Sequence, residues 1–313
     1  MKLLITVILS CFVLPIVAQP PAARSYSQEF SVVTDNDAYL LQGSDRYYTN
    51  GLFLTYRKAY QKKADKLLRE YQLAQTIFTP YYAQVFFAEE IDRSFCGYLF
   101  GKYSQTHFYA NGQAFQWYAS LGTIGTNSLA ENLQNGIHKL EGLYSVIGWH
   151  YQVQEAFAVN TGFSYTPSAI VDNSGTVKLS PAVEAELGSV FINAKAGTYL
   201  CIGKFAKNSE SVLYNAVVST DKTAGKHREL FFYLFPQLIV QGYNATVQGN
   251  LFGNKSGTIT KTPETFVFKQ TIGLAFAKER WSSKLEAVLQ TKECTTQFQG
   301  HAWGSLQFAY RFH

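Results

Sequence analysis

The sequence is poor in charged residues. They make up 16% of the 313 residues, against about 25% in ordinary soluble domains. The net charge is +5, and the lysines and arginines are scattered along the chain, so no nucleic-acid-binding surface is expected. The low charge content instead favours a protein with a large apolar exterior.

Cysteines are few and widely spaced. Cys11 lies in the apolar N-terminal stretch, and Cys96, Cys201 and Cys294 remain. An odd number at such spacing predicts neither a disulfide framework nor a metal-binding motif. Cys96 and Cys201 are better explained as small buried or lipid-facing hydrophobic residues.

Long apolar runs are absent beyond the N-terminus. The uncharged run from 3 to 18 follows Lys2 and ends in a small residue, Ala18, which predicts a signal peptide over 1–18 and one mature domain over 19–313. A lipoprotein signal through Cys11 is the alternative. Because no later run approaches the ~20 residues that a membrane-spanning helix needs, a helical bundle in a membrane is excluded.

The chain has instead many aromatic residues, 16% of the total, in runs where bulky and small side chains alternate. Bulky residues that face one way and Gly, Ala, Ser and polar residues that face the other are typical of a membrane β-barrel. We therefore predict an all-β, twelve-stranded antiparallel outer-membrane barrel. The expected strands are 28–40, 47–60, 69–79, 95–109, 112–126, 149–166, 176–188, 189–202, 229–244, 265–278, 280–291 and 302–312.

The even strand number places both termini at one end, so the connections 36–49, 80–93 and 125–149 should meet at the other, outer end. A short helix is expected in the third connection, capped by Asn127 or Ser128 and closed by Gly142. Its apolar stripe would contain Leu129, Leu133, Ile137 and Leu140, while Gln134 and His138 share a second face.

Two stretches fit a barrel poorly. Residues 203–228 form a long connection for the end of the barrel that holds the termini. This segment can pack under the barrel floor, but the sequence does not decide its position. Pro236 lies inside a strand, where a bulge would accommodate it. The inward faces are mostly Gly, Ala, Ser and Gln, which favours a filled interior over a wide channel.

Eight short motifs follow one another along the mature chain: NDAY at 36–39, DRYYTNG at 45–51, QTIFTP at 75–80, DRSFCGYLF at 92–100, LGTIGTNS at 121–128, LQNGIHKL at 133–140, GWHYQVQE at 148–155 and YNATVQGNLF at 243–252. In this order they resemble the LpxR-type lipid A 3'-O-deacylases, a family of outer-membrane barrels that cut an ester-linked acyl chain from lipid A. The resemblance covers most of the mature chain, and the final alternating strand also resembles the terminal strand of outer-membrane barrels.

The resemblance implies a calcium-dependent hydrolase in which His138 is the general base. It places Asn36 and Asp37 in the active site as oxygen donors near the Ca²⁺, with Thr49, expected to face inward, as their neighbour. Gln134 would position the ester or the base. Without the resemblance, His138 could be a solvated rim histidine, and Asn36 and Asp37 could be turn formers. A Ser–His pair two residues apart and G-x-S-x-G are both absent from the sequence.

The connection from Tyr81 to Ile91 departs from the family because it has no basic residue and contains Glu89 and Glu90. The hypothesis is a less phosphorylated lipid A substrate whose acyl chains contact aromatic side chains. An aromatic girdle, with Lys102, Lys139 or Arg93 supplying charge, is the alternative. The aromatic residues proposed to bind substrate are Tyr81, Tyr82, Phe86 and Phe87.

Asp45–Arg46 and Asp92–Arg93 are predicted to be structural salt bridges at the rim. The expected partners are lipopolysaccharide and the outer membrane, with the site toward the outer leaflet, no nucleic acid and a monomeric state. The competing hypothesis is a non-enzymatic barrel or narrow channel of the same fold.

Overall fold

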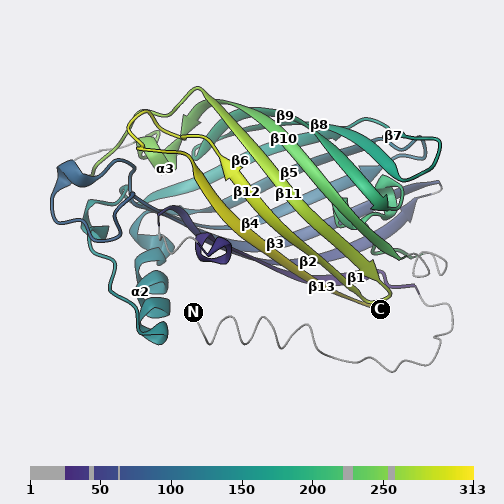
Figure 1. Cartoon of the computed structure of the whole chain (residues 1–313), viewed down its shortest axis with the longest axis horizontal. Helices are drawn as coiled ribbons and strands as arrows, with labels where there is room; N and C mark the ends of the chain where they lie inside the picture. Colours follow the sequence, from purple (N-terminus) through teal and green to yellow (C-terminus); the bar gives the residue numbers. More distant parts are fainter. Residues whose placement is uncertain (1–24, 42–45, 63, 221–227, 253–257) are drawn as a thin grey trace.

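A computed structural model describes residues 25–41, 46–62, 64–220, 228–252 and 258–313. It is a closed antiparallel β-barrel with a helix, α2 (Ala130–Glu141), standing beside one end (Figure 1). The predicted signal peptide and Asp45 lie outside the described residues. We call the two ends of the barrel the α2 end and the C-terminal end.

Each of the twelve wall strands pairs with the next wall strand along the chain, β6 pairs with β8 rather than with β7, and β13 pairs with β1 to close the barrel. A two-residue strand, β7, extends the edge of β8. The strands are β1 (Gln28–Asn36), β2 (Tyr47–Lys62), β3 (Asp65–Thr79), β4 (Cys96–Phe108), β5 (Ala114–Ile124), β6 (Ala156–Thr166), β7 (Ile170–Val171), β8 (Val177–Gly188), β9 (Phe191–Lys204), β10 (Glu229–Asn244), β11 (Phe266–Lys278), β12 (Trp281–Gln290) and β13 (His301–Phe312).

The twelve-stranded antiparallel barrel is confirmed, with β7 in addition, and three predicted boundaries are wrong by four residues or more. The strand expected to begin at residue 69 begins at Asp65. The strand expected to begin at residue 149 begins at Ala156, because the preceding chain forms a 3-10 turn, η4 (Trp149–Tyr151). The first strand ends at Asn36 rather than at residue 40. The side chain of Asn36 accepts a hydrogen bond from the N–H of Ala38 (2.7 Å) and so starts a second turn, η1 (Asp37–Leu40).

The alternation along the wall is as predicted. In β11, Phe266 and Leu274 are exposed on the outer face, whereas Thr271 and Ala275 are buried on the inner face. Since the outward residues are large and apolar on every side of the barrel, the wall is suited to acyl chains rather than to water.

The bulge predicted at Pro236 is wrong. The pairing of β10 with β9 is interrupted at Phe235 and Pro236 but resumes in the same register, and the irregularity lies instead between Gln241 and Tyr243. Proline lacks an N–H group, so leaving two residues of one ladder unpaired accommodates it without an extra residue.

The long connection after β9 packs against the inside of the barrel at the C-terminal end. Its two short turns are η5 (Asn208–Glu210) and η6 (Val212–Tyr214), and Val212 and Ala216 are fully buried. The ammonium group of Lys66 donates to the carbonyl groups of Ser209 (2.8 Å) and Ala216. The sequence had left this segment's position open, and the structure shows that it fills the barrel floor.

The interior is closed at the α2 end by an apolar cluster, beside which lies the short helix α3 (Ala245–Gln248). All three described cysteines are buried and unpaired, and Cys96 belongs to this cluster, as predicted for a small hydrophobic residue. The buried members are Phe78, Cys96, Tyr98, Ile124, Val153, Ala158, Val190, Tyr243 and Ala245.

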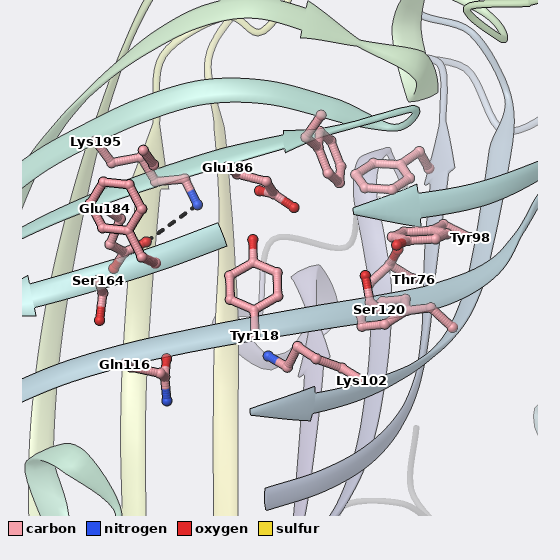
Figure 2. Close-up of a pocket in the computed structure, with 15 residues that line it drawn as sticks. Thr76, Tyr98, Lys102, Gln116, Tyr118, Ser120, Ser164, Glu184, Glu186 and Lys195 are labelled. Atoms are coloured by element: carbon pink, nitrogen blue, oxygen red, sulfur yellow. Dashed lines mark ion pairs between the residues drawn. The ribbon is translucent and has the colours of Figure 1, made fainter. Parts of the chain in front are cut away.

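Between these two closed ends the interior holds a polar cavity of about 310 Å³. Figure 2 shows Lys102, Glu184, Glu186 and Lys195 pointing into it from neighbouring strands, with Lys195 paired to Glu184 at 3.4 Å. The expectation of an interior filled by small residues is therefore wrong at mid-height, where charges of both signs line the cavity. Within the described ranges, no helix is long and apolar enough to cross a membrane.

Candidate functional site

The connections predicted to meet at one end do so. Residues 83–85 pair with Ile147 through two backbone hydrogen bonds of 3.0 Å, which join the second connection to the third. A buried apolar cluster that includes Val85, Phe95 and Trp149 packs there against Ala130 of α2. These connections therefore form one folded cap at the α2 end.

Five residues of adjacent strands form one row on the outer face of the wall beneath this cap. The register pairs Gly304 with Asn36, Asn36 with Asn50, Asn50 with Ile77, and Ile77 with Gly97. We call this the outer row.

The outer row faces away from the barrel interior because Cys96 and Tyr98, which flank Gly97, both belong to the interior cluster. Two of its glycines are covered closely. A side chain at Gly97 would collide with Ser128 and Ala130, and one at Gly304 would collide with Tyr39 of η1. The cap thus covers one end of the outer row, at Gly97, and η1 covers the other end, at Gly304. Asn36 and Asn50 lie between them.

Thr49 lies in a β-bulge, which interrupts the alternation from which an inward side chain was predicted. The register between β2 and β3 shifts between Tyr48 and Asn50. Tyr48 then shares the inner face with Gly51, over which its hydroxyl group lies, and it donates to Asp35 (2.7 Å). The extra residue resets the alternation, so Thr49 lies beside the outer row. Thr49 is buried, and its hydroxyl group has no hydrogen-bond partner among the described residues.

Asn36 and Asp37 lie where β1 turns into η1. The Asn36 oxygen is used to cap the turn. Asp37 is buried, and one of its carboxylate oxygens accepts a hydrogen bond from the N–H of Arg46 (2.9 Å). Asn36 therefore has the turn-forming role that was the alternative for these residues. The turn that it caps holds the Asp37 carboxylate next to Asn36 of the outer row.

The helix α2 begins later than predicted. Residues 126–128 form a 3-10 turn, η3, and the helix is preceded by Leu129 in a left-handed conformation without a side-chain cap. The hydroxyl group of Ser128 instead donates to Gly125 (2.6 Å). The predicted closure at Gly142 is confirmed, with φ of 71°, a conformation that glycine adopts without strain.

The buried face of α2 is its polar one. Ala130, Gln134 and His138 are buried, whereas Leu129 and Leu140 of the predicted apolar stripe are exposed. This reverses the pattern of a helix on a soluble protein. It fits a helix that rests its polar side on a polar part of the wall and turns leucines toward lipid.

The length of α2 is sufficient to bring His138 toward Asn36. Gln134 and His138 lie about 6 and 12 Å beyond Ala130 along the helix axis. Because neighbouring strands are about 4.8 Å apart, these distances correspond to between one and three strands of the wall. At its end, Glu141 lies close enough to η1 that its charge, after the larger effect of burial, contributes to raising the pKa of Tyr39. In Figure 1, α2 accordingly extends beside η1.

Two further residues fix the buried face of α2. The imidazole Nδ1 of His138 lies 2.7 Å from the carbonyl oxygen of Tyr144, whose ring packs edge-on against it. Because a carbonyl can only accept, Nδ1 carries the hydrogen, and Nε2 is the nitrogen that can take up a proton in the neutral ring. The oxygen of Gln134 accepts a hydrogen bond from the indole of Trp149 (3.1 Å).

The four aromatic residues predicted to bind substrate are divided between two places. Tyr82 and Phe86 line an open hollow of about 440 Å³, together with Tyr144. Tyr81 packs edge-on against Tyr82 but also against Phe298, and it does not line the hollow. Phe87 is exposed and also lies outside the lining.

Most of the basic residues proposed to supply positive charge near the acidic connection do not present their charge at its surface. Arg93 is fully buried and paired with Glu293 (3.0 Å), and Lys102 lines the interior cavity. The rim salt bridge predicted for Asp92 and Arg93 is wrong, because both residues are buried and Asp92 accepts hydrogen bonds from Tyr47 and Tyr81 while Arg93 pairs with Glu293. Lys139 is exposed on α2, and Arg46 stacks on the ring of Tyr81 at 4.7 Å.

The structure therefore brings Asn36, Asp37 and Thr49 close together along the chain at the outer row, and it places Gln134 and His138 on the buried face of α2, whose first residue packs on Gly97 of the same row. Sequence reasoning missed Tyr144 and Trp149, which have no periodic signal in their irregular connection. Within the described residues, no group of three or more His, Cys, Asp or Glu side chains forms a metal cluster.

A closed barrel with an apolar outer face, capped at one end by folded connections, defines an integral outer-membrane protein. The chain belongs to the LpxR family, because the model of the family described as outer membrane protein LpxR matches residues 3–312.

LpxR from Salmonella typhimurium superposes with a TM-score of 0.72 at 18% identity, covering 91% of this chain and 100% of that one, which shows a shared fold. The beta domain of the Bordetella autotransporter Brka matches with a TM-score of 0.46 at 9% identity, covering 92% and 99% of the two chains. No curated protein sequence matches the chain.

Proposed function

We propose that this barrel is a hydrolase that removes an ester-linked acyl chain from the 3' position of lipid A, with its α2 end toward the outer leaflet. The observation that supports the proposal is the buried polar face of α2, which carries Gln134 and His138 on a helix whose first residue, Ala130, packs on Gly97 of the outer row. Polar groups buried on a lipid-facing wall need hydrogen-bond partners, and in membrane proteins they commonly mark a functional site.

In this mechanism the neutral imidazole of His138 takes a proton from water, which attacks the ester carbonyl. The carbonyl of Tyr144 holds the required tautomer. Gln134, held by Trp149, positions the ester or the attacking water. The unpartnered hydroxyl group of Thr49 is available to the substrate or to a metal-bound group.

Asn36 and Asp37 supply hard oxygen donors of the type that Ca²⁺ prefers, although fewer than the six to eight ligands that it usually takes. Water and substrate oxygens would complete the set. When bound, the ion would stabilise the negative charge that develops on the ester oxygen.

The proposal is tested on lipid A from cells with and without the protein. Mass spectrometry should show the loss of one acyl unit when the protein is present. An unchanged spectrum would favour the non-enzymatic barrel. No specific observation favours that alternative, and the closed ends of the interior argue against a channel.

Removal of calcium tests the metal site. We expect a chelator to stop acyl release and Asp37→Asn to raise the calcium concentration needed for half-maximal rate, because a carboxylate binds a hard cation better than an amide does. Titration of the rate with calcium measures both effects. A calcium response identical to that of the wild type would remove Asp37 from the metal site.

The acidic second connection leads to an expectation about phosphate. With Arg93 and Lys102 turned inward, we expect no strong preference for bis-phosphorylated over mono-phosphorylated lipid A. Rates on the two purified forms in the same detergent and calcium measure this. A strong preference for the bis-phosphorylated form would show that Arg46 or Lys139 provides a phosphate contact and would contradict the hypothesis.

A further inference from the structure

The hollow beside α2 has no role in the mechanism above. It has a volume of about 440 Å³ and is a shallow depression that is largely open to the surface. Its lining combines two connections that the parallel bridge between Gln84 and Ile147 holds together. The residues that line it are Tyr82, Ala83, Gln84, Phe86, Glu90 and Tyr144.

Two polar side chains of the lining, Glu90 and Gln84, already make hydrogen bonds. The Glu90 carboxylate accepts the N–H groups of Phe86 (2.8 Å) and Phe87 (3.0 Å), which hold its pKa below the ordinary value, with Phe87 the larger cause. The amide of Gln84 lies 3.4 Å from the carbonyl of Ser145. What the hollow offers to a ligand is therefore the aromatic surface of Tyr82, Phe86 and Tyr144, which are 51%, 60% and 45% exposed.

The hollow adjoins the candidate general base through a single residue. Tyr144 lines the hollow and also contacts His138 with both its carbonyl group (2.7 Å) and its ring. The N–H of Leu143 bonds to the carbonyl of His138 (2.8 Å), so this segment cannot shift independently of the helix end. A group bound in the hollow is thus held at a fixed place relative to the imidazole.

From this adjacency we propose that the hollow binds the hydrocarbon tail of the acyl chain that is cut, so that its size determines which chain length is removed fastest. The proposal rests on the proposed hydrolase function and adds the residues that would select the substrate. An apolar tail suits a site with aromatic walls and engaged polar groups, and each methylene that leaves water contributes to binding.

Two substitutions change the hollow without removing a described hydrogen bond. Ala83→Leu narrows it, and Phe86→Ala widens it, since the Glu90 bonds use the backbone of residue 86. Phe157→Ala is the matched control, because Phe157 is as exposed as Phe86 but lies on β6, outside the hollow. Unaltered heat-modifiable migration establishes that each barrel is folded.

Acyl release is then measured on lipid A preparations whose 3' chains differ by two methylenes. We expect Ala83→Leu to lower the rate on the longer chain relative to the shorter by about tenfold. We expect Phe86→Ala to weaken the wild-type preference, and Phe157→Ala to leave it unchanged. The same chain-length preference in the wild type and in all three variants would overturn the proposal and favour an ordinary aromatic girdle. A change of that preference in Phe157→Ala as large as in the other two variants would do the same.

A second measurement does not require turnover. A free long-chain fatty acid with a terminal photoreactive diazirine is cross-linked to the folded barrel and mapped by peptide mass spectrometry. Labelling concentrated on residues 82–90 and Tyr144, and reduced in Ala83→Leu, supports the hollow as an acyl site even in His138→Ala. Labelling spread evenly over the wall overturns it, whereas labelling of the hollow without acyl release from any lipid A would refute the hydrolase function alone.

Discussion

Replacement of His138 by alanine is expected to lower acyl release by about 100-fold or more, the usual effect of removing a general base. His138 is buried on the face of α2 that covers the outer row, and the Tyr144 carbonyl selects its tautomer. Alanine is the best helix former, so α2 should persist. Initial rates on purified lipid A, with heat-modifiable migration as the test of folding, measure the effect.

The matched control is His150→Ala. His150 lies in the neighbouring turn η4, is exposed and stacks on Tyr151, so its loss should leave the rate nearly unchanged. If His138→Ala retained near-normal turnover, the proposed mechanism would be wrong while the barrel assignment would stand. Equal losses in both variants would indicate a disturbed cap rather than a missing base.

The barrel could be predicted from the sequence because its wall obeys a simple rule. Residues such as Phe266 and Leu274 alternate with Thr271 and Ala275 along each strand, and a two-residue period needs no tertiary information. The rule fails at Thr49, where one extra residue changes which side chains face outward. A bulge leaves no mark in composition, so the two-residue alternation alone does not show which way the Thr49 side chain faces.

The candidate site was harder to predict because it depends on the cap. The spacing of Gln134 and His138 places them on one helix face, but the sequence does not reveal that this face is buried while Leu129 and Leu140 are exposed. Likewise, the adjacent charges of Asp92 and Arg93 suggest a rim salt bridge, but in the fold Arg93 pairs with Glu293 instead. Contacts between residues that are 150 or 200 positions apart, such as those of Arg93 with Thr246 and Glu293, carry no local signal.

Arg93 holds together three parts of the cap. Its guanidinium donates to Glu293 from both Nε (3.2 Å) and Nη2 (3.0 Å), to the hydroxyl group of Thr246 (3.0 Å) and to the carbonyl of Ser94 (3.1 Å). It also lies 4.3 Å from the ring centre of Phe78. The second connection, α3 and the segment before β13 are therefore tied to one fully buried cation.

Arg93→Ala is expected to destabilise the cap by about 3–5 kcal/mol, because removal of one partner leaves the other charge and several polar groups without compensation in a buried place. The barrel wall itself has its own ladder of hydrogen bonds and should remain. Limited proteolysis should therefore show rapid cleavage within residues 80–95, while heat-modifiable migration of the barrel persists.

Two controls distinguish the loss of a buried ion pair from the loss of a charged residue at the surface. Lys207→Ala removes a similar pair with Glu210 (2.9 Å), but Lys207 is 69% exposed, so at most about 1 kcal/mol is expected. The double variant Arg93→Met with Glu293→Met removes both charges and should recover much of the protease resistance, because the cost arises from the unpaired partner rather than from loss of the pair. If Arg93→Ala resisted cleavage as well as the wild type does, the cap would be stabilised elsewhere, with the apolar cluster around Trp149 sufficient to hold His138 over the outer row.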